Sequence, residues 1–314
     1  FMTTVLISHT DCLGHITPGE HPEKFERLVS INNALEDIDD PSLVKIEAPL
    51  GKDLDILRAH SEKYLEYLKK VTPSSDVVSL DADTFMSQGS LLAARRGVGG
   101  IIKGVDLVLS SEAANAFVIT RPPGHHAEKE RAMGFCLFGN VAIAAKYALD
   151  HYQLSKVAIV DFDVHHGNGT QDILWDEERV LFVSSHQMPL FPGTGYASEK
   201  GLQNNIMNIP LEPNTSSQSF RALYEKKVFP ALESFSPDLL LISAGFDAHS
   251  SDPLATINLF EEDFEWLTHR LCDLATTLCG GRLVSTLEGG YDLDALAASA
   301  RVHLEVLLKR GKND

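Results

Sequence analysis

Two aspartates and a histidine alternate where a short apolar run of the sequence ends. Asp161, Asp163 and His165 are spaced two residues apart, and an extended backbone places such side chains on one side. A carboxylate and an imidazole at this spacing can reach a single cation. Asp247, which follows another apolar run, offers a further carboxylate. One histidine and two carboxylates leave a position open for water or substrate, which is typical of a catalytic zinc site.

The same residues also have a plainer interpretation. Asp161 and Asp163 could cap a following helix, because aspartate favours helix N-termini, and His165 could be an ordinary loop residue. For an isolated Asp-x-His this interpretation is the better one. Asp247 and a tandem histidine pair at 125 and 126 favour the metal site instead.

His125 and His126 follow the run RPPG, whose prolines and glycine fix the backbone and hold both rings in place. A neutral imidazole can act as a general base and, once protonated, as a general acid. A carboxylate partner such as Asp161 would orient one ring and raise its basicity. The alternative is that one histidine is a hydrogen-bonded core residue, which is the better reading for a lone histidine.

Three aromatic residues lie beside glycines. Tyr291 follows two glycines in EGGYD, and a phenol facing a metal can donate a hydrogen bond to a developing oxyanion. Phe135 follows Gly134, and Phe191 precedes Pro192 and a glycine, so these two rings are candidates for the walls of a narrow channel. Taken alone, each of the three would be read as a core aromatic.

The elements that must position these residues alternate along the chain. Apolar, β-branched runs predict strands buried on both faces, as in parallel sheets, at residues 4–7, 116–120, 157–161, 180–184, 239–243 and 283–287. Helical periodicity separates them at residues 90–109, 141–152, 217–235, 261–278 and 293–308. This alternation predicts a single doubly wound α/β domain over residues 2–314.

The segments that follow the predicted strands are polar, titratable and rich in glycine. They read RPPGHHAE, FDVHHGNGTQ, SHQMPLFPGTGY, AGFDAHSSDP and EGGYD. Ligands of open parallel sheets bind at the carboxyl ends of the strands, so we expect these histidines and aspartates to meet at one edge. Residues 187–217 are predicted to form a long ordered loop with one short strand, and the first 80 residues are less regular.

Composition excludes several classes of protein. The chain has 314 residues, 44% of them hydrophobic, and a formal charge of −17. These values fit a globular protein and disfavour nucleic-acid coats and anionic membranes as partners. A negative exterior favours encounter with cationic substrates. Four cysteines without a C-x-x-C pair, Cys12, Cys136, Cys272 and Cys279, predict a reducing, cytoplasmic location, and no apolar run is long enough for a membrane helix.

Several runs in the same order resemble the histone deacetylase superfamily, and look closest to its class II branch and the bacterial deacetylase-like amidohydrolases. They are RPPGHHAEKERAMGFCLFGNVAIAA, VDFDVHHGNGTQ, FPGTG, SAGFDAHSSDPL, LEGGY and, nearer the start, HPEKFERL. The resemblance extends from about residue 21 to about residue 295. It implies an α/β fold of the arginase–deacetylase type, a single domain whose central, mainly parallel sheet of about eight strands is flanked by helices.

The resemblance also implies roles for residues that match the family motifs. The implied roles are zinc ligation by Asp163, His165 and Asp247, an electrostatic pair of His125 with Asp161, general base and acid catalysis by His126, and oxyanion stabilisation by Tyr291. A structural potassium ion is implied near Asp161, Asp163, His165 and Ser184. Asn168 stands where another branch has aspartate, but class II members share the asparagine. A weakly active branch has histidine in place of Tyr291, so we expect full activity here.

The implied activity is zinc-dependent hydrolysis of N-acetyl or short acyl amides of lysine side chains or small amines. Phe135 and Phe191, with Gly134, would line the acyl channel, and Asp83 in LDADTF would grip the substrate backbone or amine. The alternative is an acetylpolyamine amidohydrolase. Polyamine-selective members use an acidic gatekeeper, and Leu254 occupies one such position, which favours acyl-lysine or a small acetamide. The oligomeric state is not readable.

Three other classes of protein fit the sequence less well. An arginase-like ureohydrolase needs a carboxylate two residues after the ligand histidine, where this chain has Gly167. A binding module that kept the pocket but lost catalysis would be expected to lose a ligand or Tyr291. A dinucleotide-binding oxidoreductase needs G-x-G-x-x-G between a strand and a helix, but the glycines at 97–100 lie within a predicted helix.

Overall fold

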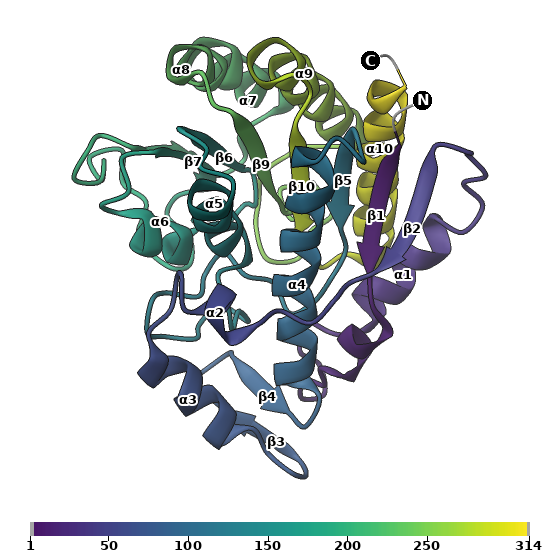
Figure 1. Cartoon of the computed structure of the whole chain (residues 1–314), viewed down its shortest axis with the longest axis vertical. Coiled ribbons are helices and arrows are strands. Elements are labelled where there is room, and N and C mark those ends of the chain that lie inside the picture. Colours follow the sequence, from purple (N-terminus) through teal and green to yellow (C-terminus); the bar gives the residue numbers. More distant parts are fainter. Residues whose placement is uncertain (1–2, 313–314) are drawn as a thin grey trace.

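The chain is built around an eight-stranded sheet. The computed structural model describes residues 3–312, so Met2, Asn313 and Asp314, at the ends of the predicted domain, lie outside the described residues. The sheet order is β2-β1-β5-β10-β9-β6-β7-β8, and each neighbouring pair is parallel. The strands are β1 (Thr4–Ser8), β2 (Leu43–Glu47), β5 (Asn115–Val118), β6 (Val157–Asp161), β7 (Val180–Gln187), β8 (Ile206–Leu211), β9 (Leu239–Ala244) and β10 (Leu283–Leu287). A small antiparallel hairpin, β3 (Val77–Ser79) with β4 (Phe85–Ser87), lies apart from the sheet (Figure 1).

The predicted α/β class is confirmed, and so are all six strands predicted from apolar runs. Strands β5, β6, β9 and β10 are buried along their whole length, as expected when helices cover both faces of a parallel sheet. The short strand predicted within residues 187–217 is β8. Strand β2 was not predicted, because this edge strand is half-exposed and carries Lys45 and Glu47 in place of a continuous apolar run.

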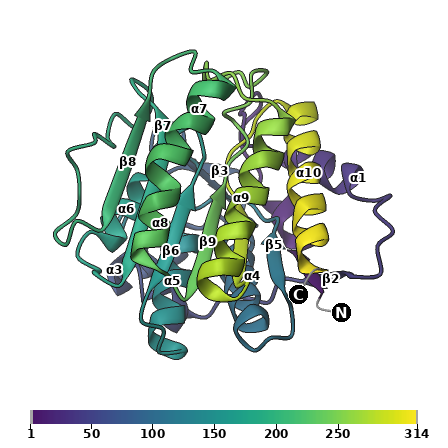
Figure 2. The same cartoon turned by 90° about the horizontal axis from the view of Figure 1, so that it is seen from above.

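Helices cover the two faces of the sheet as separate layers, which Figures 1 and 2 show from two sides. One face packs against α1 (Glu26–Ala34), α7 (Ser217–Leu223), α8 (Phe229–Phe235), α9 (Glu261–Cys279) and α10 (Leu293–Gly311). The other packs against α4 (Ser90–Leu109), α5 (Asn140–His151) and α6 (Asn168–Leu174), while α2 (Asp53–Ile56) and α3 (Glu62–Val71) add apolar side chains to the same cluster. Each layer has its own apolar core against the sheet, which fixes the strands between them.

The predicted helices are confirmed with small shifts at their ends. The segment 217–235 is helical throughout but contains one π turn, Tyr224–Val228, between α7 and α8. The glycines at 97–100 lie inside α4, as predicted. Gly99 is needed there because a Cβ would lie 2.6 Å from the carbonyl carbon of Pro49, so the helix can approach this neighbouring segment closely.

Two further expectations concern the environment of the protein. None of the helices within residues 3–312 is long and apolar enough to span a membrane. The four cysteines are buried and free of disulfides. The cytoplasmic location stays a prediction.

Candidate active site

Four neighbouring strands at the centre of the sheet supply the site. In the order β5, β10, β9 and β6, their carboxyl ends lead to His125, Tyr291, Asp247 and Asp161. Residues more than 160 positions apart in sequence therefore meet at one edge, as the position of ligand sites in parallel sheets predicted.

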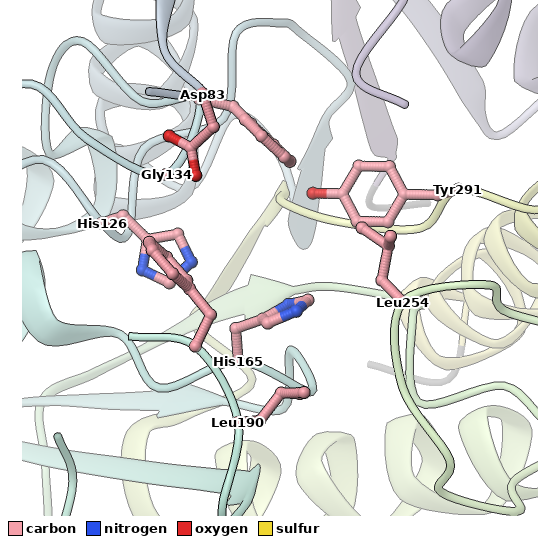
Figure 3. A pocket seen from close by; sticks show the side chains of 9 residues that line it. Asp83, His126, Gly134, His165, Leu190, Leu254 and Tyr291 are labelled. Carbon is pink, nitrogen blue, oxygen red and sulfur yellow. The ribbon is translucent and has the colours of Figure 1, made fainter. Parts of the chain in front are cut away.

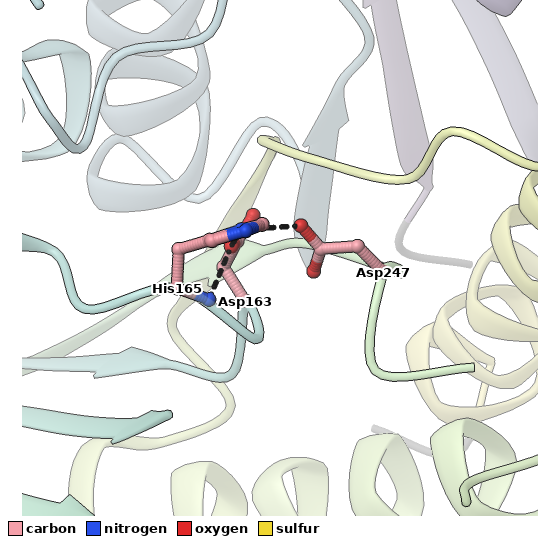
Figure 4. A group of neighbouring side chains, drawn as sticks. All are labelled: Asp163, His165 and Asp247. Carbon is pink, nitrogen blue, oxygen red and sulfur yellow. Dashed lines mark hydrogen bonds and ion pairs between the residues drawn. The ribbon is translucent and has the colours of Figure 1, made fainter. Parts of the chain in front are cut away.

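Asp163, His165 and Asp247 form a compact buried cluster. One ligand atom from each lies within 4.8 Å of the others. His165 Nδ1 lies 3.2 Å from Asp163 Oδ1 and 3.0 Å from Asp247 Oδ2 (Figure 4). The backbone N–H of Gly289 donates to Asp163 Oδ2 at 2.8 Å, and that of Val164 donates to Asp247 Oδ1 at 2.8 Å. These bonds fix the outer carboxylate oxygens and leave the inner ones facing the imidazole.

The electrostatics of this cluster suit a cation. Burial lowers the pKa of His165, but the hydrogen bonds with Asp163 and Asp247 outweigh it and raise that pKa to about 10. The two carboxylates thus draw positive charge towards the imidazole nitrogen. One nitrogen and two carboxylate oxygens are also ligands that zinc accepts in three-residue catalytic sites. The donor set therefore fits the predicted metal.

The tandem histidines have different partners and opposite electrostatics. His125 Nδ1 lies 2.9 Å from Asp161 Oδ2. Burial lowers the pKa of His125, but Asp163, Asp161 and Glu288 together outweigh it and raise that pKa well above the usual value. The pKa of His126 is lowered well below the usual value by burial and by the neighbouring charges of His125 and His165. His126 is therefore the neutral imidazole of the pair.

Asn168 sets the tautomer of His126. The Asn168 amide nitrogen donates to Glu128 at 2.8 Å, so its oxygen, 2.7 Å from His126 Nδ1, is left to accept a hydrogen bond from the ring N–H. This arrangement places the hydrogen on Nδ1 and leaves the lone pair on Nε2. His126 is one of the residues lining the pocket described next, where such a lone pair can accept a proton.

A pocket of about 210 Å³ opens above the cluster. Its lining consists of Asp83, His126, Gly134, Phe135, His165, Leu190, Phe191, Leu254 and Tyr291. Figure 3 shows the Tyr291 hydroxyl pointing across the pocket towards the side where His126 lies. The rings of Phe135 and Tyr291 pack edge to face with their centroids 5.8 Å apart. The rings of His126 and Phe191 pack in the same way, with centroids 5.1 Å apart. All five residues predicted to contact substrate, Asp83, Gly134, Phe135, Phe191 and Leu254, line this pocket.

Tyr291 is held from both sides. Its backbone N–H donates to Asp252 Oδ2 at 2.8 Å, and the Arg27 guanidinium lies 5.0 Å from the centre of its ring. Burial raises the pKa of the Tyr291 hydroxyl well above its usual value, although Arg27 opposes this. The phenol therefore keeps its proton at neutral pH and can donate it in a hydrogen bond.

Some contributors were not predicted from the sequence. Leu190 lines the pocket, and its only signal was its place before Phe191 in an otherwise polar loop. Asp252 lies within the quoted run SAGFDAHSSDPL, and Arg27 lies within HPEKFERL. Neither position showed in advance that it would support Tyr291.

Residues expected to bind potassium lie close together, but their positions alone do not test for a bound ion. Asp161 and Ser184 are register partners in β6 and β7. The Ser184 hydroxyl lies 2.9 Å from His186 Nδ1, and Asp161 Oδ1 accepts from the backbone N–H of Asp163 at 3.1 Å. The potassium site stays a prediction.

Gly167 distinguishes this site from the paired-metal site of an arginase-like enzyme. A Cβ at this position would collide with the Asp161 carboxylate and lie 3.0 Å from Phe182 Cζ. A carboxylate side chain two residues after His165 therefore has no room here. This observation agrees with the expectation that an arginase-like second metal lacks a ligand.

Comparisons with known proteins agree on one family. Residues 21–307 match the histone deacetylase domain. An uncharacterised protein of Synechocystis sp. is 44% identical over 96% of this chain and 99% of its own length. The histone deacetylase-like amidohydrolase of Pseudomonas aeruginosa is 40% identical over 78% of this chain and 65% of its own length. The crystal structure of the HDA15 HD domain has a TM-score of 0.92 and 32% identity, covering 98% of this chain and 88% of that chain.

Proposed function

The chain belongs to the histone deacetylase family, and from this premise we propose that it is a zinc-dependent deacylase. Family membership supports deacetylase-type hydrolysis of an acyl amide. We propose N-acetyl or short acyl amides of lysine side chains or small amines as substrates, with acetate and a free amine as products. The observation that carries the proposal is one pocket lined by His165 of the three-residue cluster, by His126 and by Tyr291.

The proposed reaction assigns a step to each residue. A zinc ion bound by Asp163, His165 and Asp247 would polarise the acyl carbonyl and acidify a water molecule. His126 Nε2 accepts the proton of the water as its oxygen attacks the carbonyl carbon. The Tyr291 hydroxyl donates to the oxyanion that develops. The protonated His126 then gives its proton to the departing amine nitrogen.

The remaining pocket residues support a preference among substrates. The rings of Phe135 and Phe191 can flank the methylene chain of an acylated lysine, and the Asp83 carboxylate can accept from a substrate N–H or bind an amine. Leu254, in the position of a gatekeeper, offers no charge to a distal ammonium group. These features favour acyl-lysine or a small acetamide. Asp83 and the net charge of −17 keep an acetylpolyamine as the second candidate.

The direct test combines metal analysis with a substrate panel. We expect the purified protein to contain one zinc ion per chain and to deacetylate acetyl-lysine peptides with a higher kcat/KM than acetylputrescine, acetylspermidine or longer acyl amides. A strong preference for acetylspermidine over every peptide would reverse the substrate order. Absence of hydrolysis across the panel by the zinc-loaded protein would contradict the proposed function.

Replacement of Gly134 by alanine is expected to lower kcat by about 10²-fold, the typical cost of displacing a catalytic group by about 1 Å. Gly134 has a φ of +55°, and a Cβ there would lie 2.6 Å from Cγ of His126, so the imidazole must move. Gly280→Ala is the matched control, because its φ is +58° and no atom lies within 4 Å of its Cβ. Equal kcat values for the two variants would show that the His126 position tolerates the added carbon.

A further inference from the structure

Glu288 is a buried carboxylate that accepts three hydrogen bonds near the histidine pair. It follows the last residue of β10 and is 1% exposed. Its Oε2 accepts from the backbone N–H groups of Gly124, at 2.7 Å, and His125, at 3.1 Å. Its Oε1 accepts from the Ser243 hydroxyl at 2.9 Å. All three partners are uncharged donors, and two of them belong to the loop that carries the histidine pair.

The backbone of the same residue belongs to the loop that carries Tyr291. The Glu288 carbonyl accepts from Arg27 Nη2 at 2.6 Å, and the Gly290 carbonyl accepts from Arg27 Nε at 2.7 Å. Between them, the Gly289 N–H donates to Asp163. Glu288 therefore ties the loop of the histidine pair, through its side chain, to the loop of Tyr291, through its main chain.

A carboxylate is energetically unfavourable at a buried position of this kind. Burial raises the pKa of Glu288, which shows that its charged form is poorly solvated there. A buried charge is costly relative to an apolar side chain unless hydrogen bonds and nearby opposite charge offset it. The neighbouring His125 imidazole lowers the pKa of Glu288 and so opposes the effect of burial. Two of the hydrogen bonds that offset this cost come from the backbone N–H groups of Gly124 and His125. The carboxylate at this position therefore fixes the loop that carries the histidine pair.

We propose that Glu288 is a positioning residue for the hydrolysis. Its carboxylate fixes the backbone at Gly124 and His125 relative to Tyr291, so that the base, His126, and the oxyanion donor, Tyr291, face one substrate carbon. Glu288 is not part of the pocket lining, so it acts through these residues and does not touch the substrate. The inference rests on the deacylase activity proposed above and deepens it.

The test compares Glu288→Ala with Glu288→Gln in the zinc-loaded full chain. Glu288→Ala removes all three acceptor bonds, and we expect kcat to fall by about 10²-fold while KM changes less than about threefold, because the channel walls are untouched. Glu288→Gln keeps an oxygen that can accept from Gly124 and His125, so its kcat should exceed that of Glu288→Ala at least about tenfold. Equal losses in the two variants would overturn positioning by these bonds.

Asp263 provides a control for general destabilisation. It is a fully buried carboxylate at the start of α9 and outside the pocket, and it accepts from the backbone N–H of Phe260, from the Ser217 hydroxyl and from Arg221 Nε at 2.7 Å. Asp263→Ala should lower Tm as Glu288→Ala does, yet keep kcat close to that of the wild type. A comparable loss of kcat in Asp263→Ala would mean that instability alone explains the Glu288 result.

Hydrogen exchange separates a failure of this inference from a failure of the proposed function. In Glu288→Ala, the amides of Gly124 and His125 should exchange at least about tenfold faster than in the wild type, since each loses its acceptor. This measurement needs no substrate. Unchanged exchange rates at Gly124 and His125 would overturn the inference even if the wild-type protein hydrolysed no acyl amide. If the wild type is active and Glu288→Ala is fully active too, the inference fails but the deacylase assignment stands.

Discussion

Replacing His126 by alanine, or Tyr291 by phenylalanine, is expected to lower kcat for deacylation by at least about 10²-fold. The first variant removes the imidazole that we propose as acceptor of the proton of the attacking water. The second removes only the hydroxyl that we propose as donor to the oxyanion and leaves the ring against Phe135 and Arg27. Neither residue belongs to the Asp163–His165–Asp247 cluster, so the zinc content should stay at the wild-type value. Steady-state kinetics with an acetyl-lysine peptide and metal analysis of each variant check both halves of this expectation.

A tyrosine outside the site supplies the control. The Tyr147 hydroxyl donates to Asp106 at 2.9 Å, between α5 and α4, so Tyr147→Phe removes one hydrogen bond without reaching the pocket. Its kcat should match that of the wild type. Wild-type turnover in both His126→Ala and Tyr291→Phe, with zinc bound, would reject the assigned roles.

Glu23→Ala is expected to destabilise the protein by about 3–5 kcal/mol, the usual cost of removing one partner from a buried ion pair. Glu23 is fully buried and accepts from Arg121 at 2.7 Å through each carboxylate oxygen. It also accepts from Arg27 Nη1 at 3.1 Å. Loss of this carboxylate leaves two buried guanidinium groups, each 0% exposed, without their shared counter-charge.

The free energy of unfolding in urea or guanidinium chloride measures this effect. Asp37→Ala is the matched control, because its side chain is 72% exposed and its ion pair with Arg301 lies at the surface. Exposed pairs of this kind contribute only about 0–1 kcal/mol. A Glu23→Ala variant no less stable than Asp37→Ala would show that the two arginines find other partners or water.

The central strands were predictable because burial on both faces leaves a continuous apolar run, as in Leu239–Ala244. The first 80 residues lacked such a signal. Helices α1 and α3 are short and expose one side, while β2 lies at the edge of the sheet with Lys45 and Glu47 half in solvent. Elements of this kind are specified by what they pack against, which their own sequence does not state.

The residues of the candidate site also differ in how far the sequence predicted them. Asp163, His165 and Asp247 could be proposed because their types and spacing carry the chemistry, and the family resemblance supported them. Glu23 and Arg27 stand four residues apart, but Glu23 precedes α1, and Arg121 joins Glu23 from 98 positions away. Glu288 accepts from the backbone of Gly124 and His125, which lie more than 160 positions earlier in the chain. Support of this kind arises from tertiary contact, so the sequence alone did not reveal it.

The position of β10 has a consequence for synthesis. It is the last strand within residues 3–312, yet it pairs with β5 on one side and β9 on the other. A ribosome-bound chain that has not yet released residue 287 can therefore hold only two half-sheets, β2-β1-β5 and β9-β6-β7-β8, each with an unpaired inner edge. Such edges are prone to pair with other chains. β10 pairs with both edges and, in the same step, places Tyr291 near the histidine pair, so the candidate active site can form only after residue 291 has been synthesised.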